Sequence, residues 1–148
     1  MTAHDMTLGA QDAEDLEIIS ARLQDAVAKV GDLVYLPKSR RFAGLFNRFR
    51  WEAKDDTRVR AGLYFNDVTA CKAHNLRRDN PDAVVSLLAI RFTPRRGEDP
   101  GGEDPGGEVE LLFSGGGVLK LDVECIDAGL SDVSGEWAAL GRPSHEDK

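Results

Sequence analysis

The stretch from Val109 to Ile126, VELLFSGGGVLKLDVECI, constrains the fold more than any other part of this sequence. Its second half alternates between apolar and charged residues, which is the period-two pattern of a strand with one dry and one wet face. The dry positions are Leu119, Leu121, Val123 and Cys125. Glycine supplies the positive φ angles of a tight reversal, so the run SGGG at 114–117 predicts a hairpin of two antiparallel strands. An isolated hairpin is marginal in water, so further strands or a helix must cover its apolar face.

An amphipathic pattern near the N-terminus predicts a helix that can provide this cover. Apolar residues recur at steps of three and four between Leu16 and Val30, and Asp12 can cap the first turn. Gly31 is suited to end a helix in the left-handed conformation. We therefore expect a helix over about residues 13–30, preceded by a flexible lead-in at residues 1–11.

Further segments have the patterns of strands. They are residues 33–36, 41–52, 58–65, 68–71 and 83–92. The last of them, AVVSLLAIRF, is apolar on both faces, so it is expected in the centre of the sheet, covered on both sides; a short buried helix is the alternative. The expected fold class is α+β, with the N-terminal helix packed on a strongly bent, mostly antiparallel sheet of about six strands. Such a sheet can curl into a partly closed, pleckstrin-like barrel, although the sequence does not determine that closure.

The length and the loop signals of the chain predict one domain. A chain of 148 residues fits a single domain, which we expect over residues 12–141. Residues 94–108 contain the tandem repeat GEDPG-GEDPG, whose composition predicts a solvated acidic loop. Leu130, Val133 and Trp137 recur at helical steps and indicate a short helix or turn against the sheet. Residues 142–148 are expected to form a C-terminal tail.

Composition and motifs argue against several classes of protein. No apolar run approaches the roughly 20 residues that cross a bilayer, and no secretory signal is visible, so we expect a cytoplasmic protein without a membrane partner. Cys71 and Cys125 are expected to be buried, reduced thiols. Cys71 and His74 form one CxxH pair, whereas a zinc site usually has four ligands and a catalytic thiol needs exposure and a lowered pKa. We expect no metal, no cofactor and no catalytic residue; the oligomeric state is not specified.

Uneven charge is the most informative functional feature. The chain carries −7, but the segment from Lys38 to Arg60 has eight basic residues against three acidic ones, a local charge of +5 that leaves −12 elsewhere. The candidate partner-binding residues are Arg41, Arg48, Arg50, Arg58 and Arg60. Arg48 and Arg50 are expected on the wet face of one strand, near the arginines of the next. Like charges that face each other repel, so the protein's own carboxylates, such as Asp122 and Glu124, are an alternative set of partners.

The basic strand pair supports two hypotheses of function. In the first, the protein is a non-enzymatic binding or adaptor domain whose basic surface meets an acidic protein or RNA segment. In the alternative, it is a small enzyme that acts on an anionic metabolite, with the arginines clamping the substrate. A pocket beside the arginines containing a carboxylate or Cys71 would favour the enzyme. A flat basic face with interleaved aromatic residues would favour binding.

Three segments of the chain together resemble a known family. They are DAEDLEIISARLQDAVAKVGDLVYLPKSRRFAGLFNRFRWE, PDAVVSLLAIRF and LLFSGGGVLKLDVECIDAGLSD. In this order they resemble the bacterial family named domain of unknown function 2948, over about residues 8–145. The resemblance implies a small cytoplasmic bacterial protein and assigns no activity or catalytic residue. The doubled GEDPG departs from the family pattern as an expansion in a loop.

Overall fold

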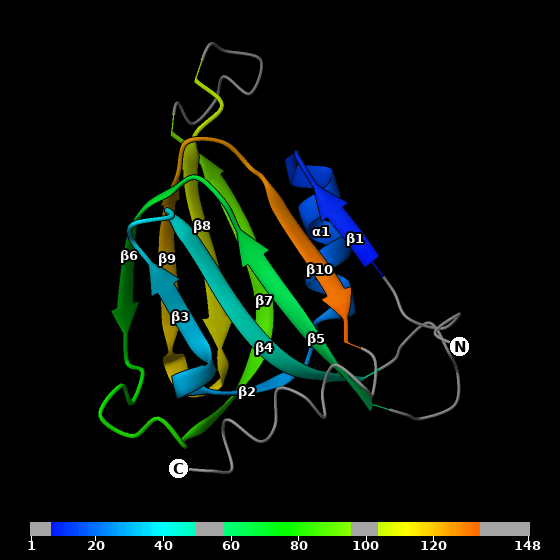
Figure 1. The fold of residues 1–148 in the computed structure, drawn as a ribbon, viewed down its shortest axis with the longest axis vertical. Helices are drawn as coiled ribbons and strands as arrows, with labels where there is room; N and C mark the ends of the chain where they lie inside the picture. The colour runs from blue at the N-terminus through cyan, green and yellow to red at the C-terminus, as the bar shows by residue number, and fades with distance from the viewer. Residues whose placement is uncertain (1–6, 50–57, 96–103, 134–148) are drawn as a thin grey trace.

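The structure is a computed structural model that describes residues 7–49, 58–95 and 104–133. Within these ranges, one helix, α1 (Ala13–Arg22), packs against a strongly curved sheet of ten strands (Figure 1). The strands are β1 (Thr7–Ala10), β2 (Val27–Lys29), β3 (Leu33–Leu36), β4 (Arg41–Phe49), β5 (Arg58–Phe65), β6 (Val68–His74), β7 (Val84–Pro94), β8 (Gly107–Phe113), β9 (Val118–Val123) and β10 (Ala128–Asp132). Their order is β1-β10-β5-β4-β2-β7-β8-β9-β6, and β3 pairs with β4 off this path. The α+β class and the mostly antiparallel sheet are confirmed.

The hairpin predicted around the glycine run is confirmed. β8 and β9 pair antiparallel, and the short 3₁₀ turn between them contains Gly115 and Gly116 at φ angles of 77° and 84°. The predicted dry face of β9 is buried at Leu119, Leu121 and Val123. Cys125 lies beyond the end of β9 and is half-buried.

The helix begins where the sequence predicts, but it ends at Arg22 rather than at Val30. The Asp12 side chain caps it, accepting a hydrogen bond from the backbone N–H of Asp15 at 2.8 Å. The expected continuation to residue 30 is wrong, because the chain turns at Asp25 (φ 66°) and then forms β2 between β4 and β7. Pairing with β7 replaces the helical hydrogen bonds, since the backbone N–H of Asp25 donates to the carbonyl of Leu87.

The sheet is larger than the predicted six strands, because segments expected to be irregular or helical are strands. β1 falls within the expected flexible lead-in and pairs with β10, which also pairs with β5. β10 replaces the short helix expected around Leu130. A Cβ on Gly129 would lie 2.4 Å from the ring of Tyr64, so only glycine lets this ring lie across β10. Trp137 and the expected tail lie outside the described residues.

The sheet curls but does not close into the expected barrel. The chain turns at Asp67 (φ 57°) from β5 into β6, which lies at the far end of the strand order. There the backbone N–H of Val68 donates to the carbonyl of Arg40 at 2.8 Å. β6 and β3 therefore approach each other (Figure 1), but in the described part of the chain no ladder joins them.

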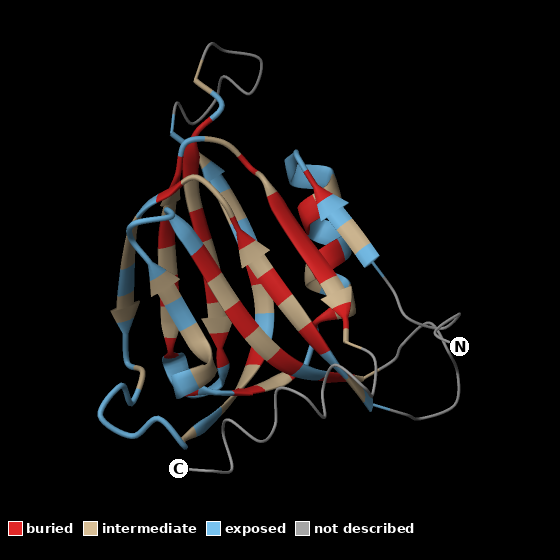
Figure 2. Ribbon diagram, viewed as in Figure 1, coloured by how far each residue is buried: buried red, intermediate tan, exposed pale blue. Residues whose placement is uncertain are grey.

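Buried residues alternate with less buried ones along β4, β5, β8 and β9 (Figure 2), and with α1 they form the core. The helix contributes Leu16 and Ile19 to the core and packs between β7 and the β1–β10 pair. β7 is central in the strand order, as predicted, but it is not covered on both sides. Val84 is 63% exposed and Leu88 is 49% exposed, so its outer face meets solvent.

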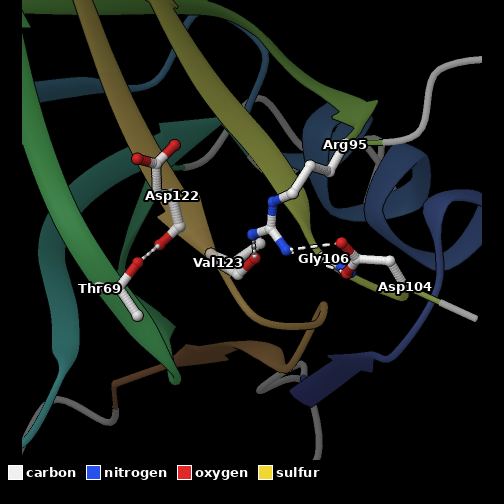
Figure 3. Close-up of polar contacts among 6 residues, drawn as sticks. All are labelled: Thr69, Arg95, Asp104, Gly106, Asp122 and Val123. Carbon is white, nitrogen blue, oxygen red and sulfur yellow. Dashed lines mark hydrogen bonds and ion pairs between the residues drawn. The ribbon is translucent and has the colours of Figure 1, made fainter.

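A polar clasp holds the second copy of the GEDPG repeat against the sheet (Figure 3). The Arg95 guanidinium, just past β7, donates to both carboxylate oxygens of Asp104 at 2.9 Å and to the carbonyl of Val123 at 3.0 Å. Asp104 in turn accepts a hydrogen bond from the backbone N–H of Gly106 at 2.8 Å. Within the expected loop, Asp104 and Gly106 are therefore held by hydrogen bonds, while residues 96–103 lie outside the described ranges.

Deleting residues 97–101 should change the free energy of unfolding by less than about 1 kcal/mol, because loop-closure entropy varies slowly with loop length. Deletion of either repeat unit gives the same sequence, so the shortened chain keeps one aspartate to form the clasp with Arg95. Urea titration of the parent and the shortened chain measures the difference. A fall of several kcal/mol would show that both units are required for packing.

Candidate functional site

Three of the predicted arginines share the solvent side of β4 and β5. In the antiparallel register Asn47 faces Arg60 and Phe49 faces Arg58, while Arg41 has the same strand parity as Asn47 and Phe49. Arg41, Arg58 and Arg60 are exposed, whereas the alternate positions of both strands point into the core. We call this surface the basic face, defined by Arg41, Arg58, Arg60, Phe49 and Tyr64.

Aromatic rings support two of these arginines. The Arg41 guanidinium lies 4.7 Å from the centroid of the Tyr64 ring, and its Nε donates to Oδ1 of Asn66 at 2.9 Å. The Arg58 guanidinium lies 5.7 Å from the centroid of the Phe49 ring. Exposed cation–π contacts of this kind contribute about 0.5–1 kcal/mol each. They hold the guanidinium groups against the sheet, and both arginines remain exposed.

The middle of the basic face has a position without a side chain, Gly62. Gly62 of β5 faces Leu45 on one side and Ser131 of β10 on the other. A Cβ on Gly62 would meet nothing within 4 Å, so the space above this position is open. A peptide laid along the strands could therefore extend from Arg41 at one end of the basic face to Arg58 and Arg60 at the other without a steric barrier at Gly62.

Arg48 does not belong to this surface, and its expected position on the wet face is wrong. Its side chain is 0% exposed and forms a bidentate ion pair with Asp132 of β10. Nε donates to Oδ1 at 2.8 Å and a terminal nitrogen donates to Oδ2 at 2.9 Å. Arg48 points inward because it shares the parity of Phe42 and Phe46, which are core residues.

The remaining basic residues of the positive segment differ in their partners. Arg40 pairs with Glu124, so the protein's own carboxylates take two basic residues of the positive segment, Arg40 and Arg48. Arg50 lies outside the described residues. Over the ranges that the structure describes, Arg41, Arg58 and Arg60 form no ion pair with a carboxylate.

Cys71 lies in a cavity, but not beside the predicted arginines. A cavity of about 400 Å³ between β3 and β6 includes Cys71 but none of the predicted arginines. Burial raises the pKa of the Cys71 thiol above its ordinary value, and the charge of Arg78 only partly opposes this effect. His74 is three residues further along β6 and hence on its other face, so the two do not form a catalytic pair.

A hollow beside Arg60 has a carboxylate but is small. It has a volume of about 180 Å³ and is lined by Asp32 and Asn47, among others. Pockets for small ligands usually have volumes of about 300–1,000 Å³. Within the described residues no three His, Cys, Asp or Glu side chains are grouped to hold a metal ion. None of the described helices has the length and apolar character needed to span a membrane.

Comparison with known proteins identifies the family. The family model described as Protein of unknown function (DUF2948) matches residues 6–145. The chain belongs to this family. No curated protein and no solved structure matches it. The resemblance inferred from three segments is confirmed, and membership of DUF2948 brings no activity or site residue with it.

Two aromatic members of the basic face of this DUF2948 protein could not be assigned from sequence. Tyr64 and Phe49 have the same parity as the exposed arginines of their strands, which is the available signal. The contact of Arg41 with Tyr64, however, depends on the register between β4 and β5, in which Ala43 faces Tyr64. That register could not be fixed from the sequence, because no short turn signal joins the end of β4 at Phe49 to the start of β5 at Arg58.

Proposed function

We propose that this DUF2948 protein is a non-enzymatic binding domain that holds an extended acidic protein segment on the basic face. The observation that carries the proposal is the set of exposed arginines, Arg41, Arg58 and Arg60, without carboxylate partners among the described residues. Guanidinium groups form bidentate, charge-assisted hydrogen bonds with carboxylates. The acidic side chains of a partner could supply the carboxylates that the described part of the chain does not place beside these arginines.

The spacing of the arginines favours a long ligand over a small metabolite. Arg41 and Asn47, which faces Arg60, are six positions apart on β4. At about 3.3 Å per residue the two ends of the basic face are roughly 20 Å apart. One small anion cannot contact both ends, whereas an extended peptide of about seven residues can.

The same face favours an acidic peptide over RNA. Single-stranded RNA is usually held by bases stacked on exposed aromatic rings. Here Arg41 and Arg58 already lie over Tyr64 and Phe49. The net charge of −7 also opposes the approach of a long polyanion. A peptide with a few carboxylates needs only local contacts, for which the stacked guanidinium groups are already placed.

The double variant Arg58→Glu/Arg60→Glu tests this proposal. We expect it to bind a fluorescent peptide of alternating glutamate and serine at least about tenfold more weakly, because two attractive contacts become repulsive. Fluorescence anisotropy measures the affinity, which should also fall with added salt because exposed charges are screened over about 8–10 Å. The matched control is Lys72→Glu/Arg77→Glu, which makes the same change in net charge at exposed residues away from the basic face.

Gly62→Glu tests whether the ligand spans the face. The added side chain enters open space above the sheet, so the fold should be kept while a carboxylate blocks the path between the two groups of arginines. We expect weaker peptide binding and an unchanged melting temperature.

Two outcomes would contradict the proposal. If the control Lys72→Glu/Arg77→Glu weakened peptide binding as much as Arg58→Glu/Arg60→Glu, the binding would be a nonspecific effect of net charge. Tighter binding of oligouridylate than of the peptide would assign the face to RNA instead.

A further inference from the structure

We propose a second, separate ligand site for a small amphipathic carboxylate, in the cavity left where the curled sheet fails to close between β3 and β6. The cavity has a volume of about 400 Å³, within the usual range for small-molecule pockets, about 300–1,000 Å³. Its walls are mainly apolar and include Leu33, Phe42, Ala73, Leu76 and Leu119. An apolar chain placed there would exchange contact with water for contact with these walls.

Hydrogen bonds at both ends of the cavity fix β3 and β6 relative to each other without pairing them as strands. At one end the Tyr35 hydroxyl donates to the carbonyl of Val68 at 2.9 Å, which ties β3 to the start of β6. At the other end the loop after β6 is tied back, because the backbone N–H of Gly31 donates to the carbonyl of Pro81 at 2.9 Å. β3 and β6 are thereby positioned without pairing, and the opening is a built feature of the fold.

The charged residue that lines the cavity, Arg78, favours a negatively charged ligand. Arg78 lines the cavity, is exposed, and has no ion pair in the part of the chain that the structure describes. Its neighbour Arg77 instead lies 3.9 Å from Asp79 and does not line the cavity. None of the described lining residues is acidic, so an anionic head group meets one cation and no opposing carboxylate. The charge of Arg78 extends to Cys71 on the cavity wall, where it lowers the thiol pKa against the effect of burial.

The site is independent of the basic face, although the two share β4. Phe42 points into the cavity, whereas Arg41, the preceding residue, is on the opposite side of the strand. A ligand in the cavity would be bound whether or not an acidic peptide binds outside. Failure of one proposal therefore leaves the other standing.

Calorimetric titration with three ligands of one chain length tests the head-group assignment. The probes are decanoate, decanol and decyltrimethylammonium, each kept below its micelle concentration. We expect saturable binding of one decanoate per chain, weaker binding of decanol and the weakest binding of the cation. Arg78→Gln should weaken decanoate about tenfold and leave decanol unchanged, while the matched control Arg77→Gln should change neither. Equal binding of all three probes, or equal effects of the two variants, would overturn the proposal.

Alkylation of the two cysteines locates the ligand in the unmodified protein. Cys71 lines the cavity, whereas Cys125 lines a separate hollow whose carboxylates, Asp12, Glu14 and Asp104, oppose an anion; both are half-buried free thiols. We expect decanoate to slow the reaction of iodoacetamide with Cys71 and to leave the rate at Cys125 unchanged, as measured on the two peptides by mass spectrometry. Equal slowing at both thiols would indicate adsorption elsewhere, and no slowing at Cys71 would show that the cavity is empty; either result would overturn the proposal.

Ala73→Trp provides an independent test by filling the cavity from β6. Ala73 is on the same face of the strand as Cys71 and borders the cavity. We expect loss of decanoate binding with near-parent secondary structure by circular dichroism. Undiminished binding in this variant would contradict the proposed location, and if the variant does not fold, the alkylation experiment decides the question.

Discussion

Replacing Asp132 with alanine should destabilise the protein by about 3–5 kcal/mol, because it removes the carboxylate that pairs bidentately with the buried Arg48 guanidinium. The Arg48 side chain is 0% exposed and that of Asp132 is 1% exposed, so water cannot take the place of the missing oxygens. The Arg48 guanidinium also donates a hydrogen bond to the carbonyl of Phe49 at 3.2 Å, but a neutral carbonyl does not supply the negative charge of the carboxylate. The loss should exceed that of any single exposed ion pair in the protein.

Urea denaturation of Asp132→Ala measures this loss, with Asp82→Ala as the matched control. Asp82 lies 4.0 Å from Lys29 with both side chains largely exposed, so its removal should cost under about 1 kcal/mol. The double variant Arg48→Met/Asp132→Leu should recover much of the stability, because it removes both charges and keeps the volume filled. A loss below about 1 kcal/mol for Asp132→Ala would mean that Arg48 reaches solvent or another carboxylate.

Leu121→Ala should cost about 2–5 kcal/mol, because a fully buried leucine in a packed core leaves a cavity when it is shortened. Leu121 is 0% exposed and belongs to the inner face of β9, together with Leu119 and Val123. Lys120, on the opposite face, has a side chain 37% exposed and a distant contact of 3.9 Å with Glu110. Its replacement by alanine should cost under about 0.5 kcal/mol, as for most surface changes.

Equilibrium unfolding of Leu121→Ala and Lys120→Ala in the same buffer compares the losses of unfolding free energy at two adjacent positions on opposite faces of β9. A larger loss from Lys120→Ala than from Leu121→Ala would place the strand one residue out of register, with every side chain on the other face. Circular dichroism in the absence of denaturant checks that both variants start from the same fold.

The parts of the fold that could be predicted are those where two local signals agree. In the β8–β9 hairpin, strict alternation and a glycine turn point to the same structure. The end of α1 could not be predicted, because β2 is only three residues long and its neighbours continue a helical spacing. Hydrogen bonds to β7, distant in sequence, decide that segment. The helical spacing around Leu130 likewise predicts a helix, whereas pairing with β5, distant in sequence, makes this segment a strand.

The candidate site could be predicted only where one strand face is clearly polar. β5 alternates cleanly, so the exposure of Arg58 and Arg60 follows from its pattern. β4 has large apolar residues on both faces, such as Phe46 and Phe49, and its inner face cannot be identified from parity. Arg48 therefore looked like a surface residue. Its partner lies 84 positions later in the chain, where no local pattern could reveal it.

The position of β10 between β1 and β5 has a consequence for synthesis. As the chain leaves the ribosome, β5 can pair with β4 but lacks its second neighbour, β10, and the Asp132 carboxylate that pairs with Arg48, until residue 132 has emerged. The sheet therefore cannot be completed strand by strand during translation. Pairing between such distant segments is slow, because loops must close before contacts form. During that interval the bare edge of β5 is open to strands of other nascent chains, so the unfinished polypeptide is the form most exposed to aggregation.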